Sequence, residues 1–157
     1  MFLIEVTAPR GALTEADRGT LAEEIISGLI SAGDGSAEVP EATMRRARRM
    51  THLGFHALTD WHTGDGLWRP PAAPPLWFRI TVPEAWRTEL SRHLMGWIRR
   101  VVHRLDRRHG WTREPSSLWV TLTGVAEGSI GLGGRPGGAD DVLDHLTEEF
   151  RAGTDPA

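Results

Sequence analysis

The chain of 157 residues contains no cysteine, which excludes disulfides, thiolate zinc sites and cysteine nucleophiles. It also has no apolar stretch near the roughly 20 residues that a membrane span needs. The apolar start, residues 1–9, contains Glu5 and ends at Pro9. Because this segment lacks the basic region of a signal peptide, we expect a cytoplasmic protein with no membrane partner.

A basic excess is absent as well, because the formal net charge is −3. Arginines cluster in residues 45–49 and 99–108. Such runs are more often a solvated helix face, or partners for acidic residues, than a grip on phosphates. We therefore expect no nucleic-acid partner. The glycine-rich residues 131–138 lack the Lys-Ser/Thr of a nucleotide-binding loop, which favours a turn or a subunit-contact loop.

What the sequence does contain is one pattern twice. Residues 3–8 predict a strand. Thr14 and Asp17 resemble a capping box that opens a helix over residues 15–31. An arginine-rich connection, a strand over residues 50–58 and a glycine turn complete the first unit.

The pattern restarts at Ile80-Thr81-Val82-Pro83, which parallels Val6-Thr7-Ala8-Pro9 at a distance of 74 positions. An amphipathic helix closed by Gly110 follows, with Arg104 expected on its outer face. A strand over residues 118–125 and a second glycine turn then complete the second unit. Residues 140–150 predict a short C-terminal helix.

These elements predict an α/β fold in which two tandem β-α-β units form one four-stranded sheet with two helices on one face. We expect a single domain over residues 1–157. Its parts are repeat one (1–68), a proline-rich linker (69–75), repeat two (76–138) and a C-terminal helix and tail (139–157). Phe55, Trp77 and Trp119 are expected on the other face of the sheet, which predicts an oligomer.

The duplicated units, the Gly-x-Leu-Thr turn at residues 11–14 and the Trp-x-x-Gly turn at residues 61–64 resemble the tautomerase superfamily. The chain is most similar in form to its fused two-repeat members, such as the haloacrylate dehalogenases and malonate semialdehyde decarboxylase. The single-repeat relative is 4-oxalocrotonate tautomerase. The resemblance implies a tautomerase/MIF-like fold, a homotrimer, isomerase-type chemistry on a small carbonyl or enol compound, and no cofactor.

Members of that family begin Met-Pro and use the proline amine as an acid or base, whereas here Phe2 stands in the place of the proline. Removal of the initiator methionine requires a small second residue, so we expect Met1 to be retained. Its amine remains a candidate general base, because a free α-amino group ordinarily has a pKa of about 7.7–8.0. The alternative is that Met1 and Phe2 merely plug the site.

The resemblance places substrate-binding arginines where this sequence has Ala12 and Trp86. The nearby candidates for stabilising an enolate are Arg10, Arg79 and Arg87. Residues expected to line the same pocket, from matching positions of the two repeats, are Phe2, His52, Trp61, Trp119 and Ile130.

Three histidines, His52, His56 and His62, raise the question of a metal. On a strand, His52 and His56 lie about 13 Å apart, too far to share one ion, so no metal is expected. The leading hypothesis is therefore proton transfer by the amine of Met1 with an arginine as the enolate partner. The competing hypothesis is a non-catalytic trimer that serves as a binding or interaction protein.

Overall fold

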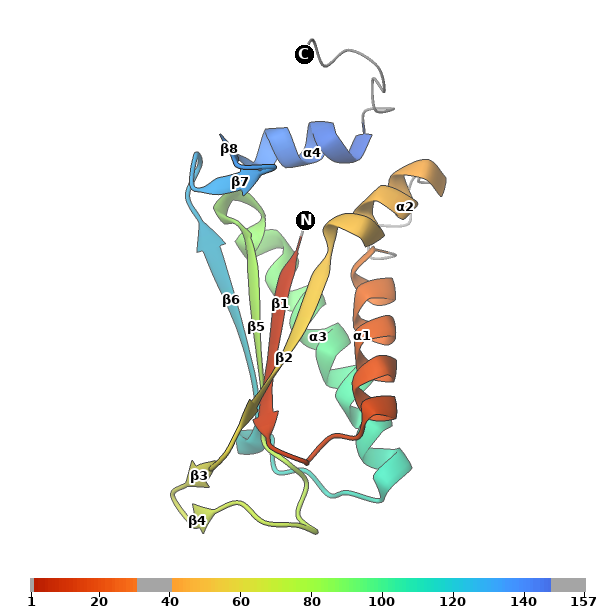
Figure 1. Cartoon of the computed structure of the whole chain (residues 1–157), viewed down its shortest axis with the longest axis vertical. Coiled ribbons are helices and arrows are strands. Elements are labelled where there is room, and N and C mark those ends of the chain that lie inside the picture. Colours follow the sequence, from red (N-terminus) through yellow and green to blue (C-terminus); the bar gives the residue numbers. More distant parts are fainter. Residues whose placement is uncertain (1, 31–40, 148–157) are drawn as a thin grey trace.

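The computed structural model describes residues 2–30 and 41–147. Its main element is a four-stranded sheet in the order β2-β1-β5-β6 (Figure 1). The strands are β1 (Leu3–Pro9), β2 (His52–Leu58), β5 (Leu76–Pro83) and β6 (Leu118–Val125). Within each unit the two strands run parallel, and β1 and β5 pair antiparallel in the centre.

Two long helices, α1 (Glu15–Ile30) and α3 (Glu84–His109), cover one face of the sheet (Figure 1). The architecture predicted from the two repeats is confirmed. The capping box is also present, because the backbone N–H of Thr14 donates to Asp17 Oδ2 at 3.0 Å and that of Asp17 donates to Thr14 Oγ1 at 3.1 Å. These bonds satisfy N–H groups that the first turn of a helix leaves unpaired.

The core lies between this helix layer and the sheet. Alternate residues of the central strands point into it and are fully buried, among them Ile4, Val6, Phe78 and Ile80. Helix α1 approaches α3 closely because residue 28 is glycine: a Cβ there would lie 1.8 Å from the Trp97 ring. Trp97 Nε1 donates to the carbonyl oxygen of Glu24 at 3.1 Å, which fixes the ring between the helices.

Three expectations need correction. The arginine-rich connection is a helix, α2 (Glu41–Met50), whose side chains pack beside α1. Phe55 packs against the core on the helix side of β2 and is not on the open face, because the period of two in a strand puts it opposite His56. Arg104 is not on an outer face either, since its Nη2 lies 2.6 Å from Glu24 Oε2 between the two long helices.

Both glycine turns contain small hairpins. Strands β3 (His62–Thr63) and β4 (Gly66–Leu67) form the first, and β7 (Ile130–Leu132) and β8 (Arg135–Gly137) form the second. A 3-10 turn, η1 (Pro115–Ser117), precedes β6, and α4 (Ala139–Thr147) is the C-terminal helix. The expectation that this helix extends to residue 150 concerns positions outside the described residues.

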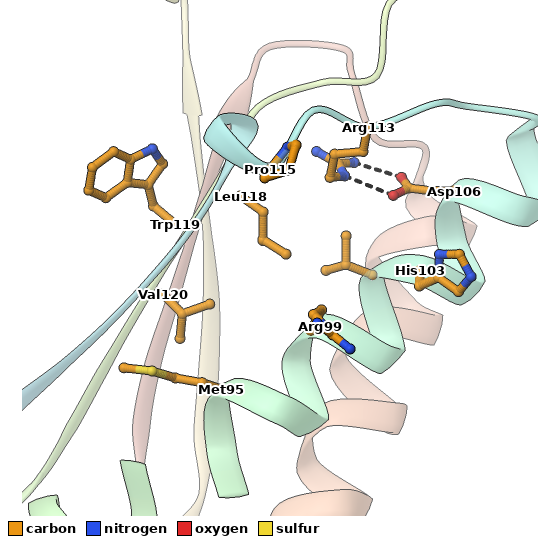
Figure 2. A pocket seen from close by; sticks show the side chains of 10 residues that line it. Met95, Arg99, His103, Asp106, Arg113, Pro115, Leu118, Trp119 and Val120 are labelled. Carbon is orange, nitrogen blue, oxygen red and sulfur yellow. Dashed lines mark hydrogen bonds and ion pairs between the residues drawn. The ribbon is translucent and has the colours of Figure 1, made fainter. Parts of the chain in front are cut away.

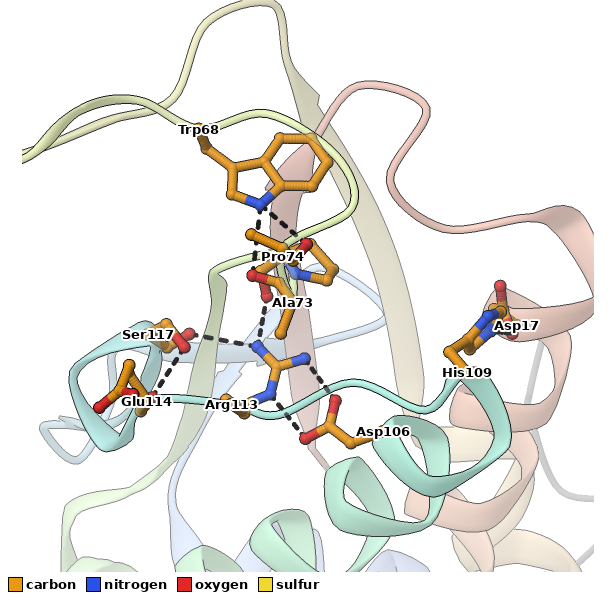
Figure 3. A network of polar contacts seen from close by, with 10 residues as sticks. Asp17, Trp68, Ala73, Pro74, Asp106, His109, Arg113, Glu114 and Ser117 are labelled. Carbon is orange, nitrogen blue, oxygen red and sulfur yellow. Dashed lines mark hydrogen bonds and ion pairs between the residues drawn. The ribbon is translucent and has the colours of Figure 1, made fainter.

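A buried polar network ties the end of α3 to the linker and to η1 (Figure 3). Arg113 donates to both carboxylate oxygens of Asp106, at 2.9 and 2.8 Å, and its Nη1 donates to the carbonyl oxygen of Pro74. The Arg113 and Asp106 side chains are each only 7% exposed. Nearby, His109 Nε2 lies 2.8 Å from Asp17 Oδ1 and so links the end of α3 to the start of α1.

Candidate functional site

The start of β1, the start of β2 and the end of β5 meet at one end of the sheet, here called the N-terminal end (Figure 1). Leu3 pairs with His52 on one side and with Thr81 on the other. The backbone N–H of His52 donates to the carbonyl oxygen of Phe2 at 2.9 Å. Phe2 and His52 are therefore neighbours. Met1, the predicted base, lies outside the described residues.

Arg87 belongs to the same end, because α3 begins where β5 ends. Its Nε and Nη2 donate to Glu84 at 2.8–3.0 Å, and the side chains are 44% and 51% exposed. These hydrogen bonds raise the pKa of Arg87 and lower the pKa of Glu84. Nη1 has no hydrogen bond among the described residues, so the guanidinium keeps donors that can face a ligand.

This ion pair lies against the end of β6 because residue 124 is glycine. A Cβ there would come within 1.5 Å of Glu84 Oε2 and 3.1 Å of Arg87 Cδ. The close approach places the guanidinium beside the strand end. In the sequence, Gly124 is only a glycine inside a predicted strand. The fold shows why a glycine stands there: any side chain would collide with Glu84.

A cleft of about 520 Å³ between α2 and α4 is the part of this region that sequence reasoning missed. Its lining residues are Ala42, Arg45, Arg46, Arg49, Met50 and His145. Met50 is followed after one residue by His52, so the cleft adjoins the start of β2. The three arginines bring cations to this cleft, and Arg45 is paired with Glu41 one turn earlier on α2. The arginine cluster at residues 45–49 was visible in the sequence. The sequence did not show that α4 would lie opposite this cluster.

Arg79 lies in the middle of the open face, with its Nη1 3.7 Å from Glu5 Oε2 and its guanidinium 4.7 Å above the Trp77 ring. Glu5 also contacts His56 Nε2, at 3.2 Å. These residues line a shallow hollow of about 310 Å³ on the sheet. Arg79 is thus held by a carboxylate and an indole on the surface that was expected to pack against other copies.

Other predicted site residues are at the opposite end of the sheet. Arg10 follows β1 directly, which puts it about 26 Å along the strand from Phe2. Trp61 precedes the β3-β4 hairpin and Trp119 is near the start of β6, with 61% of its surface exposed. Ile130 begins β7, in the hairpin that follows β6 at the N-terminal end.

Arg87 is at the N-terminal end of the sheet but beside the end of β6, three strands across from His52 on β2, and Ile130 is at that end as well. Within one chain the structure therefore brings together Phe2 and His52. It does not bring Arg10, Trp61 or Trp119 to them. No group of three or more histidine or acidic residues that could hold a metal ion occurs in the described ranges, 2–30 and 41–147. Within those ranges, no helix is long and apolar enough to cross a membrane.

No protein-family model matches the sequence, and no curated protein matches it either. Solved structures do match. One is the F6 fused 4-OT, described as an asymmetric trimer, with a TM-score of 0.60 and 15% identity over 85% of this chain and 94% of that one. A second is N1, a member of the cis-3-chloroacrylic acid dehalogenase family, with a TM-score of 0.58 and 11% identity over 93% and 92%.

A macrophage migration inhibitory factor-like protein from Entamoeba histolytica matches with a TM-score of 0.58 and 11% identity over 86% of this chain and 97% of that one. At these identities the likeness concerns the fold. The chain shares with these structures an α+β fold that has a mixed four-stranded sheet and two covering helices.

Proposed function

We propose that the chain is a tautomerase-like enzyme that moves a proton on a small, anionic carbonyl or enol compound, with the amine of Met1 as general base. The observation that carries the proposal is that cations from two separate elements lie at the end of the sheet where β1 begins. Arg87 lies at the first turn of α3, and the arginine-lined cleft between α2 and α4 adjoins the start of β2.

The chemistry follows from this arrangement. Removal of a proton beside a carbonyl leaves an enolate, whose charge needs donors placed where it develops. A guanidinium provides several N–H donors in a fixed plane, and it stays charged throughout the working pH range. Arg87 is the first candidate for this role because its Nη1 has donors left over from the pair with Glu84. The arginines of α2 supply attraction for an anionic substrate.

The experiment first identifies the N-terminal residue of the purified protein by intact-mass measurement. Ketonisation of phenylenolpyruvate is then followed for the native chain, for a chain with Gly-Ser-Gly added before Met1, and for a control with the same three residues added after Ala157. If the amine is the base, the N-terminal addition should lower kcat/KM by at least about tenfold, within the usual range for general-base catalysis. The C-terminal addition should have no effect.

Equal rates for all three chains would refute the role of the amine. A second prediction distinguishes loss of the basic amine from simple obstruction of the site by the added residues. The value of kcat/KM for the native chain should rise with pH as the α-amino group loses its proton. A flat profile between pH 6 and 9 would contradict the proposal.

The alternative, a non-catalytic binding protein, is favoured by two observations: Phe2 packs against the hydrophobic core, and Arg87 is engaged by Glu84. Under this alternative, phenylenolpyruvate is not turned over by the native chain at any pH. The same chain would still assemble and bind small anions.

We further propose that three copies assemble through the open face of the sheet. Trp119, Leu3 and Leu58 are 61%, 49% and 43% exposed there, which is a large apolar surface for a small monomer. Light scattering should give the mass of three chains. Trp119→Asp should shift that mass toward one chain, and Arg108→Asp, on the helix side, should not. A native protein that runs as a monomer at micromolar concentration would refute the trimer.

A further inference from the structure

A third cavity, of about 550 Å³, lies between α3 and the edge strand β6 (Figure 2). It is called the α3-β6 groove here. Its apolar side is formed by residues of β6 that face the helices, Leu118 and Val120, together with Val102 of α3. Leu118 and Val120 are only half-buried, because the helix layer does not fully cover the outermost strand.

The mouth of the groove carries Met95, Arg99 and His103, which follow one another at four-residue spacing on α3. Such residues lie on one face of a helix, one above the other. Met95 is 40% exposed, and both Arg99 and His103 are exposed. Figure 2 shows Arg99 and His103 along α3, across from Leu118 and Val120, and Met95 reaching from the helix to a place beneath Val120.

The groove has a positive charge at its mouth, because the acidic residue that lines it, Asp106, is already neutralised by Arg113. Asp106 is the one acidic residue among those that line it in the described chain, and both of its oxygens accept from Arg113. That pair is almost completely buried, so it forms part of the floor and has no net charge. Arg99 has no ion pair within the described residues. An apolar floor therefore lies next to an unneutralised guanidinium.

We propose that the α3-β6 groove binds a small organic anion with an apolar or aromatic body, whose acid group is held by Arg99 and His103. The volume falls within the range of small-molecule sites, about 300–1,000 Å³. The floor buries the apolar body, and the charged group stays at the mouth, where a guanidinium can bind a carboxylate with two parallel hydrogen bonds.

The site is independent of the proposed N-terminal chemistry. The groove begins near Met95, in the middle of α3, and extends toward the end of that helix, whereas Arg87 lies in its first turn. The buried Arg113–Asp106 pair also links the floor to the linker through the carbonyl oxygen of Pro74. The floor is thus anchored from three segments, which keeps the cavity preformed.

The test uses the full-length protein and two probes of nearly the same shape, naphthoate and its uncharged analogue naphthamide, in titration calorimetry. Naphthoate should bind saturably and at least about tenfold more tightly than naphthamide, as expected when a hydrogen bond to a charged group is lost. Arg99→Gln should weaken naphthoate binding by a similar factor. Arg108→Gln, at an exposed position of the same helix, is the matched control and should have no effect.

A pair of variants at one position sharpens the result without touching the core. Met95→Glu places a negative charge at the mouth and should abolish naphthoate binding, whereas Met95→Lys, of similar size, should preserve or strengthen it. Because Met95 is partly exposed, both variants should keep the native fold, which circular dichroism checks.

Several results would overturn the proposal. They are an absence of saturable naphthoate binding, equal affinity for the two probes, or equal loss in Arg99→Gln and Arg108→Gln. A loss in Arg87→Ala but not in Arg99→Gln would place the anion at the N-terminal end instead. If Met95→Glu changes the oligomeric mass in light scattering, the groove is a contact between copies of the chain, and the proposal is wrong.

Discussion

One arginine–carboxylate pair lies near each end of helix α3, and the two pairs differ in how far they are buried. Arg113 and Asp106, where the helix finishes, are each 7% exposed and join three segments of the chain. Arg87 and Glu84, where it begins, are 44% and 51% exposed and belong to one turn of one helix. The hydrogen-bond distances are nearly the same, 2.8–3.0 Å.

Burial therefore decides what each pair can do. A buried charge without its partner has a large desolvation cost, so the Arg113–Asp106 pair is locked into the fold. An exposed pair is screened by water and exchanges partners at little cost, so Arg87 can turn from Glu84 to a ligand. The finishing end of α3 is structural, and the starting end is available for chemistry.

The largest effect is expected from Asp106→Ala, which leaves the Arg113 guanidinium buried without a counter-charge. The free energy of unfolding should fall by about 3–5 kcal/mol, the cost of breaking a buried pair. Urea denaturation at fixed protein concentration measures it. Glu84→Ala is the control at the exposed pair and should have a far smaller effect. If the two variants are equally destabilised, burial does not distinguish the pairs.

Arg87→Ala should weaken binding of phenylpyruvate by roughly 10- to 100-fold, since a hydrogen bond to a charged group is lost. Glu84→Gln should do the opposite, because it releases the guanidinium for the ligand. Titration calorimetry measures both. Arg104, which was expected on the outer face of α3, is unsuitable as a control, because it pairs with Glu24 and its guanidinium lies 5.3 Å from the centre of the Trp97 ring. Arg108→Ala replaces it, and a loss there equal to that in Arg87→Ala would remove Arg87 from the site.

Phe2→Pro restores a Met-Pro start and should permit removal of Met1, which exposes a proline amine. If the rest of the site is intact, ketonisation of phenylenolpyruvate should rise by at least about tenfold, or about 1.4 kcal/mol in the barrier. Intact-mass measurement verifies that Met1 is lost. An unchanged rate in a correctly processed, folded protein would favour the non-catalytic alternative.

The smallest effect is expected for Asp17, which lies in the first turn of α1 and contacts His109 at the end of α3. Burial tends to raise the pKa of this carboxyl, but hydrogen bonds with His109 and Thr14 outweigh it, so the pKa lies below its ordinary value of 3.8. A carboxyl with a lowered pKa stabilises the fold above that value and loses this contribution as pH falls through the folded-state pKa.

Asp17→Asn should therefore cost about 1 kcal/mol near neutral pH, the usual effect of losing a helix cap. The difference from the native protein should shrink as pH falls below 3.8. Thermal denaturation at a series of pH values measures it. A difference that stays constant down to pH 2 would show that the charge of Asp17 does not contribute.

Much of the fold could be predicted because its signals are local. Pro9 and Pro83 end matching strands, Thr14 and Asp17 form the expected cap, and Gly110 ends α3 with a φ of 67°. The α2 helix was missed because its four arginines carry little apolar signal and its stability depends on contacts with α1. One of these is Arg48 Nη2 to Glu23 Oε1, at 2.7 Å.

The candidate site was predictable only in part. His52 and Phe2 were expected to line one pocket, and the structure makes their backbones neighbours through one hydrogen bond. Arg10 and Trp61 lie beyond the far ends of β1 and β2, so the length of a strand separates them from Phe2 and His52 within the same repeat. Trp119 was assigned because its place in repeat two matches that of His52 in repeat one. In the sequence the second repeat simply follows the first. In the structure the first strands of the two repeats, β1 and β5, pair antiparallel and so run in opposite directions, which places matching residues at opposite ends of the sheet.

The sequence by itself determined the two long helices, the four strands of the sheet and the duplicated unit, because hydrophobic periodicity, caps and glycine stops act over a few residues. Only the tertiary structure decided which charges are buried and which are available. Asp106 and Glu84 are both acids on α3 that pair with an arginine, and no local pattern separates them. Their difference comes from the linker at Pro74 and the turn before β6, which close over one pair and leave the other in solvent.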